Sequence, residues 1–319
     1  MRAHWKPVIT VLLITPVLTE LLSGNLPPSV FFRPQAFLFL ATVGYGFPVL
    51  LLREFAVRRR LGLAGLLGLG FVYGIFNEGI IAKTLYLATN VPIRGFDGYG
   101  YAAGIAWPWA ITISTWHAFH SLLYPLVATY YFFPDQRNAP WFNRPGLVGL
   151  ALPTILLGTL IFFTHSPERE AGHLLQFAIM IVAGALITGI ALRLPAAPTL
   201  GHAHPLRWPA MVWGSTGYLV LTLVPVLLAN AKIPVSAFMG YSAGLFALIL
   251  CWLRKRASLP VTTVLLYAIG DAVVVALFGI GGALRHGAIQ KLVASALFLA
   301  VFGWLITRLR EDSRTGLRR

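Results

Sequence analysis

Apolar runs of membrane-spanning length recur along the whole chain, and they constrain its fold more than any other feature. A helix that crosses the hydrocarbon core of a bilayer needs about 20 mostly apolar residues. The chain offers ten such segments: 8–22, 35–52, 61–88, 103–133, 147–163, 174–191, 208–229, 234–253, 259–278 and 292–307. The sequence therefore predicts an all-α, polytopic transmembrane helix bundle of about ten spans.

Composition supports a membrane protein without a separate soluble domain. Charged residues make up 11% of the 319 residues and hydrophobic residues 57%, whereas soluble domains carry roughly 25% charged residues. The deficit extends along the whole chain, so one anchor on a soluble domain does not explain it. Cys251 is the one cysteine, which excludes an intrachain disulfide and a thiolate metal cluster.

The basic residues predict the orientation of the bundle. The net charge of +15 comes from clusters at helix ends, so we expect the lipid bilayer as partner and no nucleic acid. With the N-terminus inside, 18 Lys and Arg fall on inner segments and six on outer ones. Cytoplasmic loops carry such an excess. We therefore expect both termini in the cytoplasm and the protein in the cytoplasmic (inner) membrane of a prokaryote; the sequence defines no oligomeric state.

One long inner connection divides the chain. It reads LRLPAAPTLGHAHPLR, and its Pro, Ala and His content is typical of a flexible joint. We expect a six-span half at 1–192, a cytoplasmic linker at 193–207, and a four-span half with a basic tail at 208–319.

Ionisable residues within spans are costly and mark candidate functional sites. They are Glu20, Glu78, Lys83, His117, His120 and Asp271. Glu78 lies about 17 residues into the third span, or roughly 25 Å at 1.5 Å per residue. With the predicted orientation, these groups gather in the outer half of the membrane.

The third span carries the most informative pattern. Gly70 and Gly74 form a GxxxG pair, which allows a second helix to approach closely. Glu78 follows Gly74 by one helical turn, so its carboxyl group should face that crowded contact, next to Asn77. It is either a working carboxylate or a protonated packing residue. Lys83 is expected to reach the outer surface with its long side chain.

The fourth span carries a polar stripe about 120° wide on a helix. Its members are Ser114, His117, His120, Ser121 and Tyr124. We expect the two histidines to transfer protons or bind substrate. Zinc bound by His117, His120 and Glu78 is one alternative, and hydrogen bonding without catalysis is another. Pro108 and Pro125 are plausible places for a break in this long span.

Asp271 lies near the middle of the ninth span and shares a face with Thr263 and Tyr267. A lone carboxyl group at this depth is a candidate to titrate, because burial raises its pKa. A hydrogen bond from a Tyr or Ser on a neighbouring helix is the structural alternative.

Residues 18–146 resemble a family of prokaryotic multi-pass membrane proteins without an assigned activity. The resemblance is carried by the stretches TELLSG, LLREFAVRRR, YGIFNEGI, WHAFHSLLYP and FPDQRNAPWF. It implies a shared site with Glu78 in one span and His117 plus Ser121 in the next. It implies no particular reaction.

Two functional hypotheses follow, with a third that has no feature in its favour. The first is a transporter with an outer polar cavity formed by Glu78, His117 and His120, coupled to protons. Its small-molecule or lipid substrate would contact Asn77, Ser114, Ser121, Tyr124 and Asp271. The second is a membrane-embedded enzyme, a hydrolase or lipid-modifying enzyme, that uses the Glu and His groups. The third is an assembly or sensor protein. Apart from the zinc alternative, no cofactor is expected.

Overall fold

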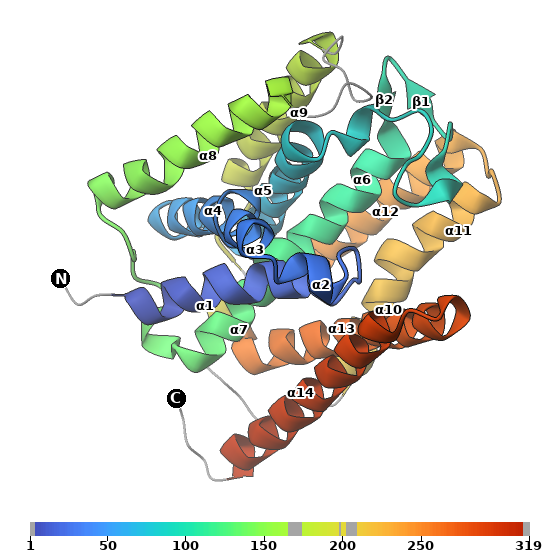
Figure 1. Cartoon of the computed structure of the whole chain (residues 1–319). Coiled ribbons are helices and arrows are strands. Elements are labelled where there is room, and N and C mark those ends of the chain that lie inside the picture. The colour runs from blue at the N-terminus through green and yellow to red at the C-terminus, as the bar shows by residue number, and fades with distance from the viewer. Residues whose placement is uncertain (1–3, 165–173, 198, 202–208, 315–319) are drawn as a thin grey trace.

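The computed structural model describes residues 4–164, 174–197, 199–201 and 209–314, and these fold into an all-α bundle (Figure 1). The α-helices are α1 (Trp5–Pro16), α2 (Pro28–Phe31), α3 (Pro34–Phe39), α4 (Gly46–Arg58), α5 (Leu63–Phe76), α6 (Trp107–Trp116), α7 (Tyr124–Phe132), α8 (Arg144–Thr164), α9 (Leu174–Arg193), α10 (Pro209–Tyr218), α11 (Val224–Asn230), α12 (Val235–Arg254), α13 (Val261–His286) and α14 (Ile289–Arg314).

Short elements interrupt or connect these helices. The π-helical segments are η1 (Val17–Leu21), η2 (Leu40–Gly44), η3 (Asn77–Ile81), η6 (His117–Leu123) and η9 (Leu219–Leu223). Short 3₁₀ turns are η4 (Thr84–Tyr86), η5 (Arg94–Phe96) and η7 (Pro134–Gln136). Strands β1 (Tyr101–Ala102) and β2 (Ile105–Ala106) form an antiparallel pair, and β3 (Thr199–Gly201) and β4 (Ser258–Pro260) a parallel one.

Each of the ten predicted spans coincides with a helical segment. Within the described residues, eight helices are long and apolar enough to cross a membrane. The two that fall short are the first helix and the fourth. The first, α1 continued by η1, is short, and the fourth, α6–η6–α7, carries the polar stripe. The chain is therefore a multi-pass membrane protein, and the count of ten spans stays a prediction.

The connections that the structure describes gather at two opposite ends of the bundle, as expected for helices that cross in alternation. At one end, Arg137 Nη1 donates a hydrogen bond to Gly201 O at 2.6 Å, and β3 pairs with β4. At the other, Tyr99 OH donates to Ile233 O at 2.8 Å. Figure 1 shows the start of α1 and the end of α14 on the same side. Which end faces the cytoplasm stays a prediction.

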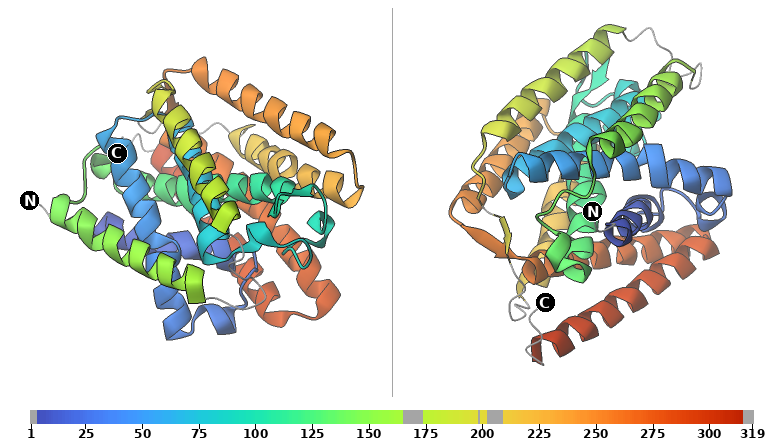
Figure 2. Two further views of the ribbon diagram at one scale, coloured as in Figure 1. Left: turned by 90° about the horizontal axis from the view of Figure 1, so that it is seen from above. Right: turned by 90° about the vertical axis from the view of Figure 1, so that its left-hand side faces the viewer.

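The helices differ strongly in burial, as a bundle in lipid requires. α5 and α13 form the core, where Leu69 and Leu266 are buried. Residues of both predicted halves join one apolar cluster. In contrast, α8, α9, α12 and α14 expose large apolar side chains, and Figure 2 shows α8 and α14 on the outside. Residues 198 and 202–208, part of the predicted linker region and its flank, lie outside the described residues.

Proline explains several of the π-helical segments. Proline has no N–H, so the carbonyl four residues earlier loses its helical donor, and in membrane helices local π-helical adjustments satisfy such freed groups. Pro48 follows η2, Pro125 follows η6 and Pro225 follows η9. The fourth predicted span is consequently a continuous helical segment whose middle is π-helical, and the expected break takes that form.

The third predicted span, 61–88, extends beyond the end of the observed helix. The helix stops at Ile81, because Lys83 adopts a left-handed conformation with φ of 55°. The expectation that Lys83 reaches the outer surface is wrong. Its side chain is buried, and Nζ lies 4.6 Å from the centre of the Phe162 ring, where a cation–π contact favours the ammonium group.

Candidate functional site

Two glycines set the distance between the third and fourth helical segments. A Cβ atom at Gly74 would overlap the Cα of Ser114, and one at Gly70 would lie 2.7 Å from the Cα of Ala118. The backbones of α5 and α6–η6 therefore touch, as the GxxxG pattern predicts. This contact places η3 beside η6, and with it Glu78 beside His117.

Glu78 and His117 form the centre of a hydrogen-bonded series. His117 Nε2 lies 3.1 Å from Glu78 Oε1, and His117 Nδ1 lies 2.7 Å from Ser121 Oγ. The Thr84 hydroxyl donates to Glu78 Oε2, and Trp109 Nε1 donates to Thr84 Oγ1 at 3.0 Å. If Ser121 donates to Nδ1, the proton of a neutral imidazole sits on Nε2 and points at the carboxylate. Every group in the series then has a partner.

Aromatic rings and a freed carbonyl fix the position of His117 and its neighbours. The Tyr73 ring meets the imidazole edge-on, with centroids 5.4 Å apart, and the Tyr45 ring stacks on it at 6.1 Å. Gly44 O, which lacks a helical donor because of Pro48, accepts from Tyr73 OH at 2.5 Å and from Asn77 Nδ2 at 3.0 Å. The Asn77 amide thus donates to Gly44 O and to Tyr73 OH, and its contact with a substrate stays a prediction.

A second carboxyl group, Glu20, lies close to this series. Tyr45 OH donates to Glu20 Oε1, and Asn25 Nδ2 donates to Glu20 Oε2 at 2.6 Å. The Thr19 hydroxyl donates to Ser121 Oγ at 3.2 Å. The sequence identified Glu20 as an intramembrane charge but did not place it at the site. A signal was present, because two polar residues, Thr19 and Glu20, follow each other inside an apolar run.

His120 takes part in a different pair. His120 Nε2 lies 3.0 Å from Asp271 Oδ2, an ion-pair distance without the alignment of a hydrogen bond. Tyr124 OH donates to Asp271 Oδ1 at 3.4 Å. The indole of Trp116 stacks on the imidazole, with centroids 3.5 Å apart. This pair joins the fourth helical segment to α13, so it connects the two predicted halves.

The polar stripe of the fourth span therefore divides between two sides of the helix. The wider π-helical turn in η6 spreads side chains three positions apart further around the axis than an α-helix does. His117 faces Glu78, whereas His120 faces Asp271. Zinc binding by His117, His120 and Glu78 stays a prediction, and within the described residues no group of three or more His, Cys, Asp or Glu is arranged to hold a metal ion.

Ser114 lies where α5 and α6 touch. Its side chain is fully buried, and its hydroxyl has no hydrogen-bond partner within the described part of the chain. The contact with Gly74 gives it a packing role. The structure thus brings Glu78, His117 and Ser121 together and leaves Ser114 outside their series.

A third buried polar cluster lies at the opposite end of the bundle, and the sequence did not single it out. Arg53 and Glu54 are both fully buried, and Arg53 Nη1 donates to Glu54 Oε1 at 2.5 Å. The Arg53 guanidinium also donates to Tyr130 OH at 3.2 Å and stacks on the Trp141 ring at 3.7 Å. Nearby, burial lowers the pKa of the Arg137 guanidinium. Two stretches of the family resemblance, LLREFAVRRR and FPDQRNAPWF, meet here.

Fold and buried polar groups together define a multi-pass helical membrane protein with two buried His–carboxylate pairs. Over residues 9–309 the chain matches the family described as an uncharacterized membrane protein family, and it belongs to that family. The match extends well beyond the stretch at 18–146 that carried the resemblance. No curated protein and no solved structure matches the chain significantly.

Proposed function

We propose that the protein is a proton-coupled transporter of the prokaryotic cytoplasmic membrane, with both termini in the cytoplasm. One observation carries the proposal: η6 bears two His–carboxylate pairs on different sides of the same helix. The His117–Glu78 pair lies within the first predicted half, at 3.1 Å. The His120–Asp271 pair links that half to α13, at 3.0 Å.

Such pairs suit proton coupling for an electrostatic reason. A neutral imidazole with a carboxylate has a net charge of −1, and uptake of one proton makes the pair neutral. In a low-dielectric interior this change strongly alters the attraction between the two groups. At His120 and Asp271 the altered attraction acts between η6 and α13, and so between the two halves.

Alternating access gives a direct test through cysteine labelling. Cys251 is the one cysteine, so Cys251→Ser provides a cysteine-free background. Thr19→Cys places a thiol beside Ser121, at a buried position. We expect a membrane-impermeant maleimide to reach this thiol from either face of oriented vesicles. Asp271→Asn should confine labelling to one face, because the pair that responds to protons is lost.

The matched control is Leu186→Cys on α9, a position exposed at the outer surface of the bundle. In lipid this thiol should resist the impermeant maleimide from both faces, because the reactive thiolate requires water. Labelling of Thr19→Cys from one face or from neither would overturn the transport proposal.

A membrane-embedded acyl-transfer enzyme is the second candidate, favoured by one specific geometry. The series Ser121–His117–Glu78 has a hydroxyl on one imidazole nitrogen and a carboxylate on the other. This is the nucleophile–base–carboxylate order of hydrolases that use serine. A fluorophosphonate probe separates the candidates: adduct formation at Ser121, lost in His117→Ala and Ser121→Ala, would favour the enzyme. For a transporter we expect no adduct in any of the three proteins.

A further inference from the structure

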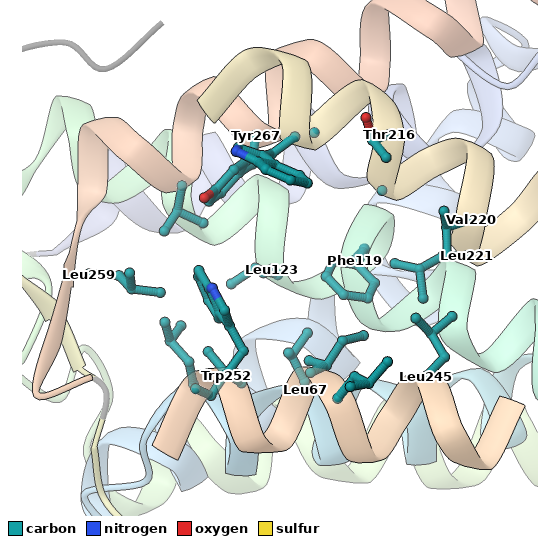
Figure 3. A pocket seen from close by; sticks show the side chains of 18 of the residues that line it. Leu67, Phe119, Leu123, Thr216, Val220, Leu221, Leu245, Trp252, Leu259 and Tyr267 are labelled. Atoms are coloured by element: carbon teal, nitrogen blue, oxygen red, sulfur yellow. The ribbon is translucent and has the colours of Figure 1, made fainter. Parts of the chain in front are cut away.

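Helix α12 stands apart from the bundle along part of its length and leaves a cavity of about 820 Å³ (Figure 3). Leu245 and Trp252 of α12 form one wall, and Val220 and Leu221 of η9 lie opposite. Phe119 lies between the two walls. We call this space the α12 groove.

The α12 groove is apolar and open to the surroundings. Leu248 and Trp252 line it and are 69% and 39% exposed. Among its described lining residues, Thr216, Tyr124 and Tyr267 carry the few hydroxyl groups. Water needs several polar partners to occupy a cavity, and an empty space of this size would forfeit many dispersion contacts. In a bilayer, a hydrocarbon chain therefore fills the α12 groove better than water or empty space does.

The length of the α12 groove matches one leaflet. Its α12 wall extends from Leu245 to Leu253, next to the end of the helix at Arg254. Nine residues at 1.5 Å each give roughly 14 Å, about half of a hydrocarbon core roughly 30 Å thick. A single lipid of one leaflet therefore fits it better than a chain that crosses the membrane.

Basic side chains at one end of the α12 groove favour an anionic lipid headgroup. Lys255 and Arg256 line that end, and the Arg256 guanidinium lies 4.0 Å from the centre of the Trp252 ring. Basic residues at the membrane surface attract anionic lipids. We propose that the α12 groove binds one anionic phospholipid, with an acyl chain between α12 and η9 and the phosphate at Lys255 and Arg256.

This lipid site adjoins the second titratable pair. A small cavity that contains His120 and Asp271 shares Phe119, Tyr124 and Leu221 with the α12 groove. A bound acyl chain would therefore contact the side chains that cover the pair. The inference itself does not depend on transport activity, because it rests on the shape and charge of the groove.

Tryptophan quenching by brominated lipids tests the proposal on the full-length protein. Bromine on an acyl chain quenches an indole on contact, and the difference between wild type and Trp252→Phe isolates Trp252. Vesicles of phosphatidylcholine receive a small fraction of dibrominated phosphatidylglycerol or, in parallel, of dibrominated phosphatidylcholine. We expect phosphatidylglycerol to be preferred near Trp252 by roughly fivefold for each basic residue. The double variant Lys255→Ala, Arg256→Ala should remove the preference.

Two glycines supply a matched pair of filling variants. A Cβ at Gly217, which lines the α12 groove, would meet no atom within 4 Å, and the same holds for Gly189 on α9, away from the groove. Gly217→Phe should fill the groove and reduce the quenching of Trp252 by phosphatidylglycerol several-fold. Gly189→Phe should leave the quenching unchanged, and thermal unfolding in detergent checks that both variants fold.

Three outcomes would overturn the proposal. They are equal quenching of Trp252 by the two lipids, unchanged quenching in a folded Gly217→Phe variant, and cross-linking of Cys251 to a second copy of the chain across the groove. Cys251 lines the groove and is exposed, so the last outcome would mean that protein covers it instead of lipid. Loss of two-sided labelling at Thr19→Cys would affect the transport proposal alone.

Discussion

Replacing Glu54 with alanine should lower the free energy of unfolding by about 3–5 kcal/mol. Glu54 Oε1 accepts hydrogen bonds from Arg53 Nη1 at 2.5 Å and from Trp141 N at 2.7 Å. Without Glu54, the fully buried Arg53 keeps its charge in a site with no carboxylate. An unpaired buried charge costs far more than the pair itself contributes. Thermal or SDS-induced unfolding of the protein in detergent micelles measures the loss.

The neighbouring Arg58 provides the control. Arg58 Nη2 lies 3.3 Å from Glu54 Oε2, but its side chain is 39% exposed. Arg58→Ala should therefore cost at most about 1 kcal/mol, as surface ion pairs do. In the double variant Arg53→Met, Glu54→Leu, both charges are removed, and much of the stability should return. A Glu54→Ala variant as stable as Arg58→Ala would contradict the buried-pair argument.

This cluster also shows where sequence reasoning reached its limit. The count of basic residues treated Arg53 as one more charge on an inner connection. Arg53 is buried because the segment that contains Gln136 and Trp141 folds back over the end of α4. Gln136 O accepts hydrogen bonds from Arg53 Nη2 at 2.8 Å and from Trp141 Nε1 at 2.8 Å. Such a fold-back joins residues more than 80 positions apart and leaves no periodic signal in the sequence.

The approach of Glu78 to His117 could be predicted, because it depends on local patterns. A glycine pair sets the helix contact, and Glu78 follows one turn later on the same face. The separate direction of His120 could not be predicted from an α-helical stripe. It depends on the π-helical turn of η6, whose cause, Pro125, was recognised only as a potential break. Asp271 thus gained a histidine partner that spacing alone did not indicate.

The glycine contact allows a second prediction with a large effect. Gly74→Val should lower the free energy of unfolding by about 3 kcal/mol or more, because its Cβ would overlap the backbone of Ser114. Overpacking typically costs 1–3 kcal/mol, and a backbone atom has less freedom to move than a side chain. Removing a glycine from a helix interior stabilises the helix by at most about 1 kcal/mol. The overlap with Ser114 costs more, so the substitution should be destabilising.

Gly244→Val on α12 is the matched control, because a Cβ there would meet no atom within 4 Å. It should leave stability within about 1 kcal/mol of wild type, since the helix-propensity change is small. The same detergent unfolding measurement serves both variants. Separation of α5 from α6 in Gly74→Val would also move Glu78 away from His117. Maleimide labelling of Thr19→Cys should therefore change when Gly74→Val is also present. With Gly244→Val in its place, the labelling should match that of Thr19→Cys alone. Equal stability of the two valine variants would mean that the glycine contact does not hold η3 against η6, and the geometry of the Glu78–His117 pair would then need another cause.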